Sequence, residues 1–135
     1  MLTAALLTIT LQHASAVSDL TGRYEQDCSS SERYSICFRL SVKQTGSQAR
    51  VSFAAAFGGG QIAAPDGEGS GSVSAGELTF RFQDSFFNQG TATLQRRGTF
   101  YILTIRATKV VEKRPLVLYA DPVRLTKKSS IPEGI

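Results

Sequence analysis

Apolar and polar residues alternate one by one along most of the chain between about residue 20 and residue 126. Phe38, Leu40 and Val42 occupy every second position of one run, and Val51 and Phe53 begin the next. Successive side chains of a β-strand point to opposite faces, so this period of two predicts strands with one buried and one solvent-exposed face.

Gly, Ser, Asn and Asp residues separate these runs and divide the alternating region into eight expected strands. The strands are expected at residues 22–27, 34–44, 48–57, 67–74, 77–84, 90–95, 99–108 and 115–126. After the N-terminal segment, no stretch of about ten or more residues has the apolar spacing of a helix. The pattern therefore predicts an all-β protein.

The connections between the expected strands are short, which favours an antiparallel meander. Closing the meander removes exposed strand edges, so we predict an eight-stranded antiparallel up-and-down barrel. Two facing sheets have the same periodicity, and a β-sandwich is the alternative. Arg39, Lys43 and Arg81 alternate with apolar residues, which leaves no lipid-facing band, and we do not expect the chain to span a membrane.

Two expected strands have unusual features. Gly67, Gly69 and Gly71 occupy alternate positions of the fourth, which predicts a barrel corner or the close approach of another group. The eighth contains Asp121 followed by Pro122, where we expect a bend.

The first sixteen residues have the pattern of an export signal. An uncharged apolar stretch is followed by Ala14, Ser15 and Ala16, which supply a small-x-small cleavage site before Val17. A first strand and a start codon placed too far downstream are the alternatives. We expect a signal peptide at 1–16, a single β-barrel domain at 17–128, a loose C-terminal tail at 129–135, and a periplasmic or secreted protein.

The cysteines fit an oxidising compartment. Cys28 and Cys37 flank a polar, turn-like sequence, so they can face each other across a hairpin and form a disulfide. Cys37 alternates with Ile36 and Phe38, which places it opposite the core, where the bridge would have a structural role. A redox-active thiol is the less favoured alternative, because no Cys-x-x-Cys spacing is present.

Residues for catalysis are scarce. The single histidine, His13, lies in the expected signal peptide, so the mature chain has no imidazole for a nucleophilic triad or for most metal sites. Asp66, Glu68, Asp84 and Asp121 all sit where turn chemistry explains a carboxylate. We therefore expect no enzyme, no catalytic residues, no cofactor and no metal.

One resemblance starts at the first expected strand. Gly22, Arg23 and Tyr24 head this strand, and Arg124 lies in the last one. The arrangement resembles that of the lipocalins, or calycin-like barrels, with tyrosine in place of the usual tryptophan. The resemblance implies that the aromatic ring packs under the arginine from the end of the barrel.

A second resemblance covers residues 71–94. This stretch contains a turn, a Leu-Thr-Phe strand, Phe86 and Phe87, and the phrase Asn-Gln-Gly-Thr-Ala-Thr-Leu at 88–94. Its layout is similar to that of the small periplasmic lysozyme inhibitors of Gram-negative bacteria, which are also exported eight-stranded barrels. The lysine that normally precedes the glycine of the phrase is absent, and residues 69–72 approximate the serine-glycine loop.

Charge is distributed unevenly along the chain. Residues 19–95 contain six basic and eight acidic side chains, whereas residues 96–128 contain nine basic and two acidic ones. The cationic segment, which covers the final two expected strands and their loops, predicts an anionic partner, such as lipid phosphates, an acidic polysaccharide or an acidic protein, and a solvated basic face is the alternative. The basic residues are not interleaved with a stacking platform, so we expect no nucleic acid.

Two functions fit these features. The first is a protein-binding module, such as an inhibitor of a cell-wall hydrolase or an immunity protein, that uses loops at one end of the barrel. Its candidate partner-binding residues are Ser70, Ser72, Phe86, Phe87, Arg96 and Arg97. For Phe86 and Phe87, the favoured interpretation is that they plug the barrel end. The second function is a lipocalin-like carrier of a small apolar ligand, whose candidate lumen residues are Phe38, Phe53, Phe80 and Phe82.

Overall fold

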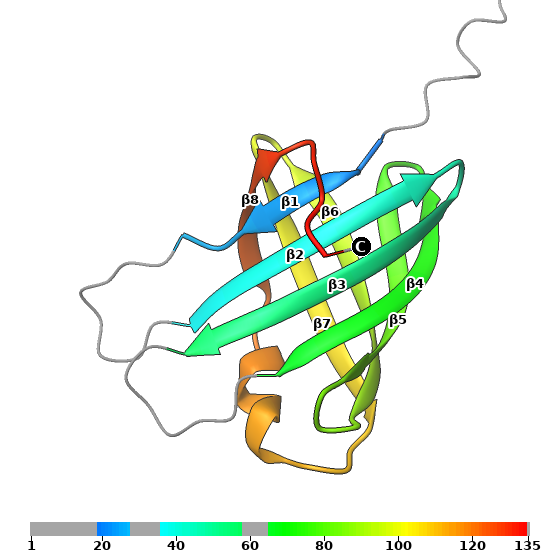
Figure 1. The fold of residues 1–135 in the computed structure, drawn as a ribbon. Helices are drawn as coiled ribbons and strands as arrows, with labels where there is room; N and C mark the ends of the chain where they lie inside the picture. The colour runs from blue at the N-terminus through cyan, green and yellow to red at the C-terminus, as the bar shows by residue number, and fades with distance from the viewer. Residues whose placement is uncertain (1–18, 28–35, 58–64, 135) are drawn as a thin grey trace, which may run out of the picture.

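The computed structural model describes residues 19–27, 36–57 and 65–134. These residues form a closed barrel of eight antiparallel strands, in which each strand pairs with the next and the last pairs with the first (Figure 1). The strands are β1 (Gly22–Glu25), β2 (Ile36–Thr45), β3 (Gln48–Phe57), β4 (Asp66–Ser74), β5 (Glu77–Asp84), β6 (Gln89–Arg97), β7 (Phe100–Lys109) and β8 (Val123–Ser129). The predicted up-and-down barrel is confirmed, and the alternative β-sandwich is wrong.

The meander places its connections alternately at two ends of the barrel (Figure 1). At one end, which we call the open end, tight turns of small or polar residues join β2 to β3, β4 to β5 and β6 to β7. At the other end, which we call the closed end, residues 85–88 join β5 to β6 and residues 110–122 join β7 to β8. A functional site at either end is therefore built from a different set of loops.

Alternation along the strands fills the interior with apolar side chains. On β5, Leu78, Phe80 and Phe82 are buried and point inward, while Thr79 and Arg81 are exposed. Burial of this face removes apolar surface from water, which is the main favourable contribution to folding. The largest fully buried apolar side chains of the strands are Tyr24, Phe38, Phe80, Leu40, Leu78, Leu94, Leu103, Leu125 and Val42.

The glycines of β4 make room for neighbouring groups. A Cβ on Gly67 would collide with the ring of Phe53, and a Cβ on Gly71 would lie 2.5 Å from the Cα of Phe80. The neighbouring strand and a core ring occupy the space that side chains would otherwise take on this face. The predicted close approach at these glycines is therefore present.

The expected eighth strand at residues 115–126 is wrong in its first half. Arg114–Tyr119 forms a 3-10 helix, η2, and β8 begins only at Val123. Pro115 lies in the first turn of η2, where its missing N–H costs nothing. Pro115, Leu118 and Tyr119 are buried while Val117 is exposed, so burial follows a helical spacing of three to four residues rather than alternation.

The C-terminal segment, expected to be a loose tail, packs on the outside of β1 and β2. The backbone N–H of Glu133 donates a hydrogen bond of 3.1 Å to the Ser41 hydroxyl. Arg23 forms an ion pair of 2.8 Å with the Glu133 carboxylate. These contacts connect residues 130–134 to the barrel wall.

Candidate functional site

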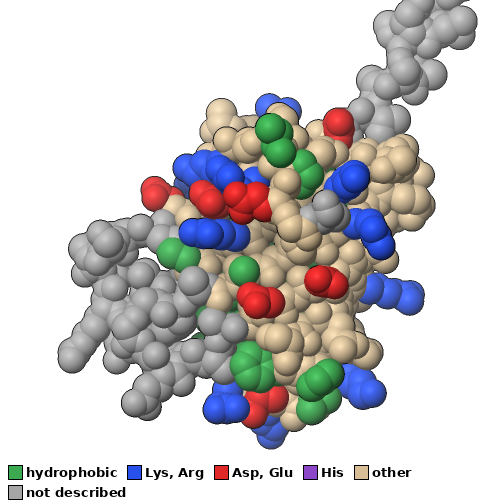
Figure 2. Space-filling view, viewed as in Figure 1, with side chains coloured by type: hydrophobic (Ala, Val, Ile, Leu, Met, Phe, Trp, Pro, Cys, Tyr) green, Lys and Arg blue, Asp and Glu red, His purple; other side chains and the backbone are tan. Residues whose placement is uncertain are grey.

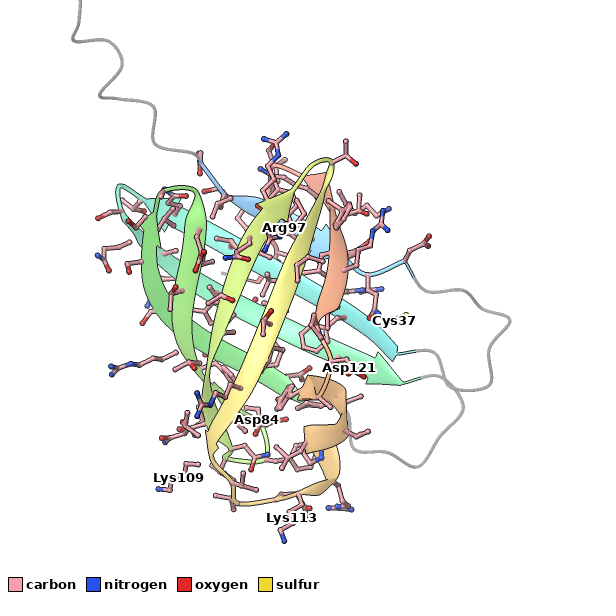
Figure 3. All side chains as sticks on the ribbon, turned by 180° about the vertical axis from the view of Figure 1, so that it is seen from behind. Cys37, Asp84, Arg97, Lys109, Lys113 and Asp121 are labelled. Atoms are coloured by element: carbon pink, nitrogen blue, oxygen red, sulfur yellow. The ribbon has the colours of Figure 1, made fainter. Side chains whose placement is uncertain are left out.

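The structure does not bring the six candidate partner-binding residues to one end of the barrel. Ser70 and Ser72 are exposed on the outer face of β4, and Ser72 lies near the open end, where it pairs with Gln48 at the start of β3. Phe86 and Phe87 lie in the closed-end turn between β5 and β6. Arg96 and Arg97 lie at the open end, as Figure 3 shows for Arg97. The length of β6 separates the phenylalanines from the arginines, so they belong to two different surfaces.

The open end contains a cleft of about 640 Å³ beside the β6–β7 hairpin. Gly98 adopts a φ of 65° in the two-residue turn of this hairpin, a conformation that glycine adopts without steric cost. The charged and aromatic side chains that line the cleft are Asp19, Glu77, Arg96, Arg97, Tyr101 and Lys127. Cations and carboxylates from four segments of the chain therefore meet in one hollow.

Hydrogen bonds hold the two arginines of this hairpin in place. The Arg97 guanidinium donates a bond of 3.0 Å to the Gln95 side chain, which in turn donates to the Glu77 carboxylate. Arg96 donates a bond of 3.0 Å from its Nε to the carbonyl of Gly98. Each arginine uses one of its nitrogens in these bonds, and a guanidinium group carries further N–H donors. No described carboxylate forms an ion pair with either arginine.

Behind the cleft, Tyr24 packs edge-on against Tyr101 with ring centroids 4.9 Å apart. Its hydroxyl donates a hydrogen bond of 2.6 Å to the Leu20 carbonyl. Burial, with the nearby Tyr101 and Asp19, raises the pKa of Tyr24 well above its ordinary value, so its hydroxyl stays protonated at neutral pH. Tyr24 therefore supports the cleft structurally, from behind.

The arginine placement implied by the lipocalin resemblance is wrong in this barrel. The guanidinium carbon of Arg124 lies 3.9 Å from the centre of the Phe100 ring, on the outer face. The cation near Tyr24 is Lys127, whose Nζ lies 5.8 Å from the ring centre. Arg124 lies between two buried residues, Val123 and Leu125, so strand alternation directs its side chain away from the interior.

A buried polar network organises the closed end. One carboxylate oxygen of Asp84 accepts hydrogen bonds of 2.9 Å from the backbone N–H groups of Phe86 and Asn88. The other accepts from the Tyr119 hydroxyl at 2.8 Å and from the Asn88 amide at 3.1 Å. The turn chemistry expected of Asp84 is present, but the sequence did not indicate that its carboxylate also holds η2.

Asn88 extends this network to the β7–β8 connection. Its side-chain oxygen accepts hydrogen bonds from the backbone N–H groups of Val111 and Glu112, at 2.7 and 2.9 Å. Its side-chain nitrogen donates to the Glu112 carbonyl at 2.9 Å. Asn88 is fully buried, and these bonds satisfy its amide. The β5–β6 turn and the segment before η2 are thus joined through one side chain.

Tyr119 closes this end of the barrel from inside. Its ring packs edge-on against Phe82, with centroids 5.6 Å apart, and against Phe53. Burial and the hydrogen bond to the Asp84 carboxylate raise the pKa of Tyr119 far above its ordinary value. The hydroxyl is therefore a permanent donor to Asp84 at neutral pH.

The expectation that Phe86 and Phe87 plug the barrel end is wrong for Phe87. Leu118 and Tyr119 occupy that position, while Phe86 is half-buried and Phe87 is 66% exposed. Phe87 also adopts a φ of 65°, because it follows a tight turn in which its N–H bonds back to the Asp84 carbonyl at 3.0 Å. This conformation directs its ring away from the barrel interior.

The four candidate lumen phenylalanines all lie inside the barrel and are buried. The rings of Phe38 and Phe53 stack with centroids 5.5 Å apart, and Phe53 packs edge-on against Phe82 at 5.3 Å. Phe80 is also in ring contact with Phe82. Together with Tyr119, these rings occupy the space in which a carrier would hold a ligand.

Other kinds of site receive no support within the described ranges. Residues 19–27, 36–57 and 65–134 contain no group of three or more His, Cys, Asp or Glu side chains arranged to hold a metal ion. In the same ranges no helix has the length and hydropathy needed to cross a membrane. Cys28 and the expected signal peptide lie outside the described residues, so the Cys28–Cys37 disulfide and the export signal stay predictions.

The fold and the two ends define a closed eight-stranded antiparallel barrel with a packed interior, which is consistent with a calycin-like barrel. Comparison of the chain with protein-family models, curated proteins and solved structures gave no significant match.

Proposed function

We propose that the chain is an exported, non-enzymatic β-barrel module that binds a protein of the cell envelope, as an inhibitor or immunity-type protein. The observation that carries this proposal is the arginine hairpin, residues 96–99, which presents two exposed guanidinium groups beside the open-end cleft. Arginine is among the residues that contribute most to binding energy at protein interfaces.

The packed interior supports recognition at the surface. A carrier of a small apolar ligand needs a connected cavity of roughly 300 Å³ or more inside the barrel. Phe53 instead contacts both Phe38 and Phe82, and Tyr119 covers the closed end. A lipocalin-like carrier function is therefore less well supported than a binding module.

The chemistry of the hairpin favours a partner with carboxylates in a recess. A guanidinium presents its donors in a planar fork that matches a carboxylate. Glycoside hydrolases, including those that cleave cell-wall polysaccharide, have a pair of carboxylates in a concave active site. A projecting hairpin with two arginines fits such a site by shape and by charge.

The layout of residues 71–94 supports the same class of function. This stretch resembles the lysozyme inhibitors, and in the structure it forms the β4–β5–β6 wall that leads directly into the arginine hairpin. Export and a Cys28–Cys37 bridge belong to the proposal, since both suit a protein that works in the cell envelope.

Inhibition of purified lysozyme-type hydrolases tests this function. We expect the protein to slow the lysis of a cell-wall suspension, and the Arg96→Gln/Arg97→Gln variant to raise the inhibition constant about thirtyfold, because two arginine contacts with carboxylates are lost.

Arg81→Gln combined with Arg106→Gln is the matched control. Both arginines are exposed on the outer faces of β5 and β7, away from the hairpin. The control variant should inhibit as well as the wild type. An absence of inhibition together with an absence of any envelope protein bound to the wild type would argue against the proposed function, as would an equal loss in both double variants.

A further inference from the structure

We propose that the closed end of the barrel is a docking tip for an anionic lipid bilayer. Phe87, Val111 and Val117 enter the interfacial region of the bilayer, and Lys109 and Lys113 contact the lipid headgroups. The tip lies at the opposite end from the arginine hairpin (Figure 3), so this inference does not depend on the proposed protein partner.

Exposed apolar side chains gather at this end. Among the described residues, five large hydrophobic side chains are exposed, and four of them, Phe87, Val110, Val111 and Val117, belong to the closed-end connections. Phe87, Val111 and Val117 are 66%, 60% and 55% exposed. The described turns at the open end consist of small or polar residues. An apolar tip confined to one end is typical of an interaction surface.

The backbone of Phe87 supports a functional role for its ring. A φ of 65° is disfavoured for a bulky residue, and glycine or asparagine normally occupies this position of a hairpin turn. The sequence retains a large exposed phenylalanine there. Neither core packing nor the turn explains this choice, whereas a contact outside the protein does.

The buried network beneath the tip fixes its shape before binding. Asn88 holds the backbone of Val111 and Glu112, and Asp84 holds both the β5–β6 turn and Tyr119. Phe87 and Val111 are therefore presented together on a rigid base. A preformed tip loses little conformational entropy when it binds.

Charge at the tip matches an anionic surface. Lys109, Lys113 and Arg114 are exposed. Of the nearby acidic residues, Glu112 forms an ion pair of 3.0 Å with Arg114, and Asp66 is exposed beside Ser85, so Lys109 and Lys113 are the cations left for the headgroups. Figure 2 shows Lys and Arg side chains beside hydrophobic ones at this end of the molecule. Lysines behind an apolar tip can extend along the surface to lipid phosphates while the apolar groups insert.

A bilayer fits this surface better than a second protein. The exposed apolar groups lie on a tight turn, on the short segment between β7 and η2, and on a 3-10 helix of six residues, rather than on a broad face. A stable protein interface needs about 800 Å² from each partner. A fluid lipid interface adapts to a small apolar tip and supplies the negative charge.

Fluorescence provides a direct test, because the chain contains no tryptophan. In the full-length protein, Phe87→Trp places a single fluorophore at the tip, and Ile131→Trp places one at an exposed site beyond β8. With vesicles of phosphatidylcholine and phosphatidylglycerol in equal parts, we expect a blue shift and quenching by brominated acyl chains for the first variant only. Unchanged emission of the Phe87→Trp variant, or equal shifts in both, would overturn the proposal.

Vesicle sedimentation separates insertion from simple charge attraction. Phe87→Asn should weaken partitioning about tenfold, because the apolar side chain is lost, and Ile131→Asn should leave it unchanged. Lys113→Gln should weaken it about fivefold, with Lys43→Gln on the side of β2 as its control.

The Phe87→Asn variant should stay folded, because asparagine tolerates the φ of this position. Its partitioning therefore reports on the lost side chain and not on unfolding. We expect its thermal midpoint to equal or exceed that of the wild type. Wild-type partitioning by a folded Phe87→Asn variant would overturn the proposal. So would binding of a soluble acidic protein at this tip without any binding to vesicles.

Discussion

Replacement of Asp84 by alanine is expected to lower the free energy of unfolding by about 4 kcal/mol. The carboxylate of this 3% exposed residue accepts four hydrogen bonds, from two backbone N–H groups, the Asn88 amide and the Tyr119 hydroxyl. Alanine supplies no acceptor, so these donors lose their partner in a site from which water is largely excluded. A buried donor without a partner costs about 1 to 3 kcal/mol.

Chemical denaturation of the Asp84→Ala variant measures this loss. Hydrogen exchange should also become faster at the backbone amides of Val111 and Glu112, because Asn88 is no longer held in position to accept from them. Asp121→Ala is the matched control, because Asp121 is exposed and lies in the β7–β8 connection, which also contains Val111 and Glu112 (Figure 3). This substitution should change the free energy of unfolding by no more than about 0.5 kcal/mol. Equal stability of the Asp84→Ala variant and the wild type would contradict the structural role of the network.

Replacement of Gly71 by alanine is expected to destabilise the barrel by at least about 3 kcal/mol. The added Cβ would collide with the carbonyl oxygen of Thr79 and would lie 2.7 Å from the Cβ of Phe80. Both groups belong to β5, which pairs with β4 at this point, so neither can move without disturbing the ladder between the strands.

Gly46→Ala separates this steric effect from backbone conformation. Gly46 has a φ of 63° and no atom within 4 Å of an added Cβ, so alanine there costs only the left-handed conformation, about 1 kcal/mol. Thermal or chemical unfolding should therefore show that the Gly71→Ala variant is much less stable than the Gly46→Ala variant. The opposite order would mean that β4 and β5 are not in close contact.

The alternation of apolar and polar residues identified the barrel, because each strand has one buried and one solvent-exposed face. The bounds expected for residues 48–57 and 77–84 coincide with those of β3 and β5. In both strands, turn residues mark the ends and every second side chain is apolar. The pattern also indicated that Phe38 and Phe53 would point inward, but it could not indicate whether a cavity would remain between the rings.

Residues 115–126 show where alternation is insufficient. Leu116 and Leu118 are two positions apart, as in a strand, yet Pro115, Leu118 and Tyr119 pack as one face of η2. A short apolar run fits both periods, and tertiary packing against the barrel end determined which one formed. Proline at its start was the available signal for a helical turn.

The candidate site was only partly predictable for a similar reason. Arg96, Arg97 and Phe87 could be singled out from the sequence as candidate contacts, but the expectation placed them on one surface. Asp84 continues the inward series of Phe80 and Phe82, so its burial could have been recognised from alternation. Its partner Tyr119 is 35 positions away, and the pairing of the two could not be recognised from the sequence, because no local pattern joins them.

Native mass spectrometry of the protein purified from the cell envelope tests the central claim most directly. If the barrel is filled by its own side chains and recognises its partner from outside, the expected mass is that of the polypeptide alone, or that of a complex with another protein that Arg96→Gln/Arg97→Gln disrupts. A small apolar molecule retained in stoichiometric amount, and released only on unfolding, would contradict the claim.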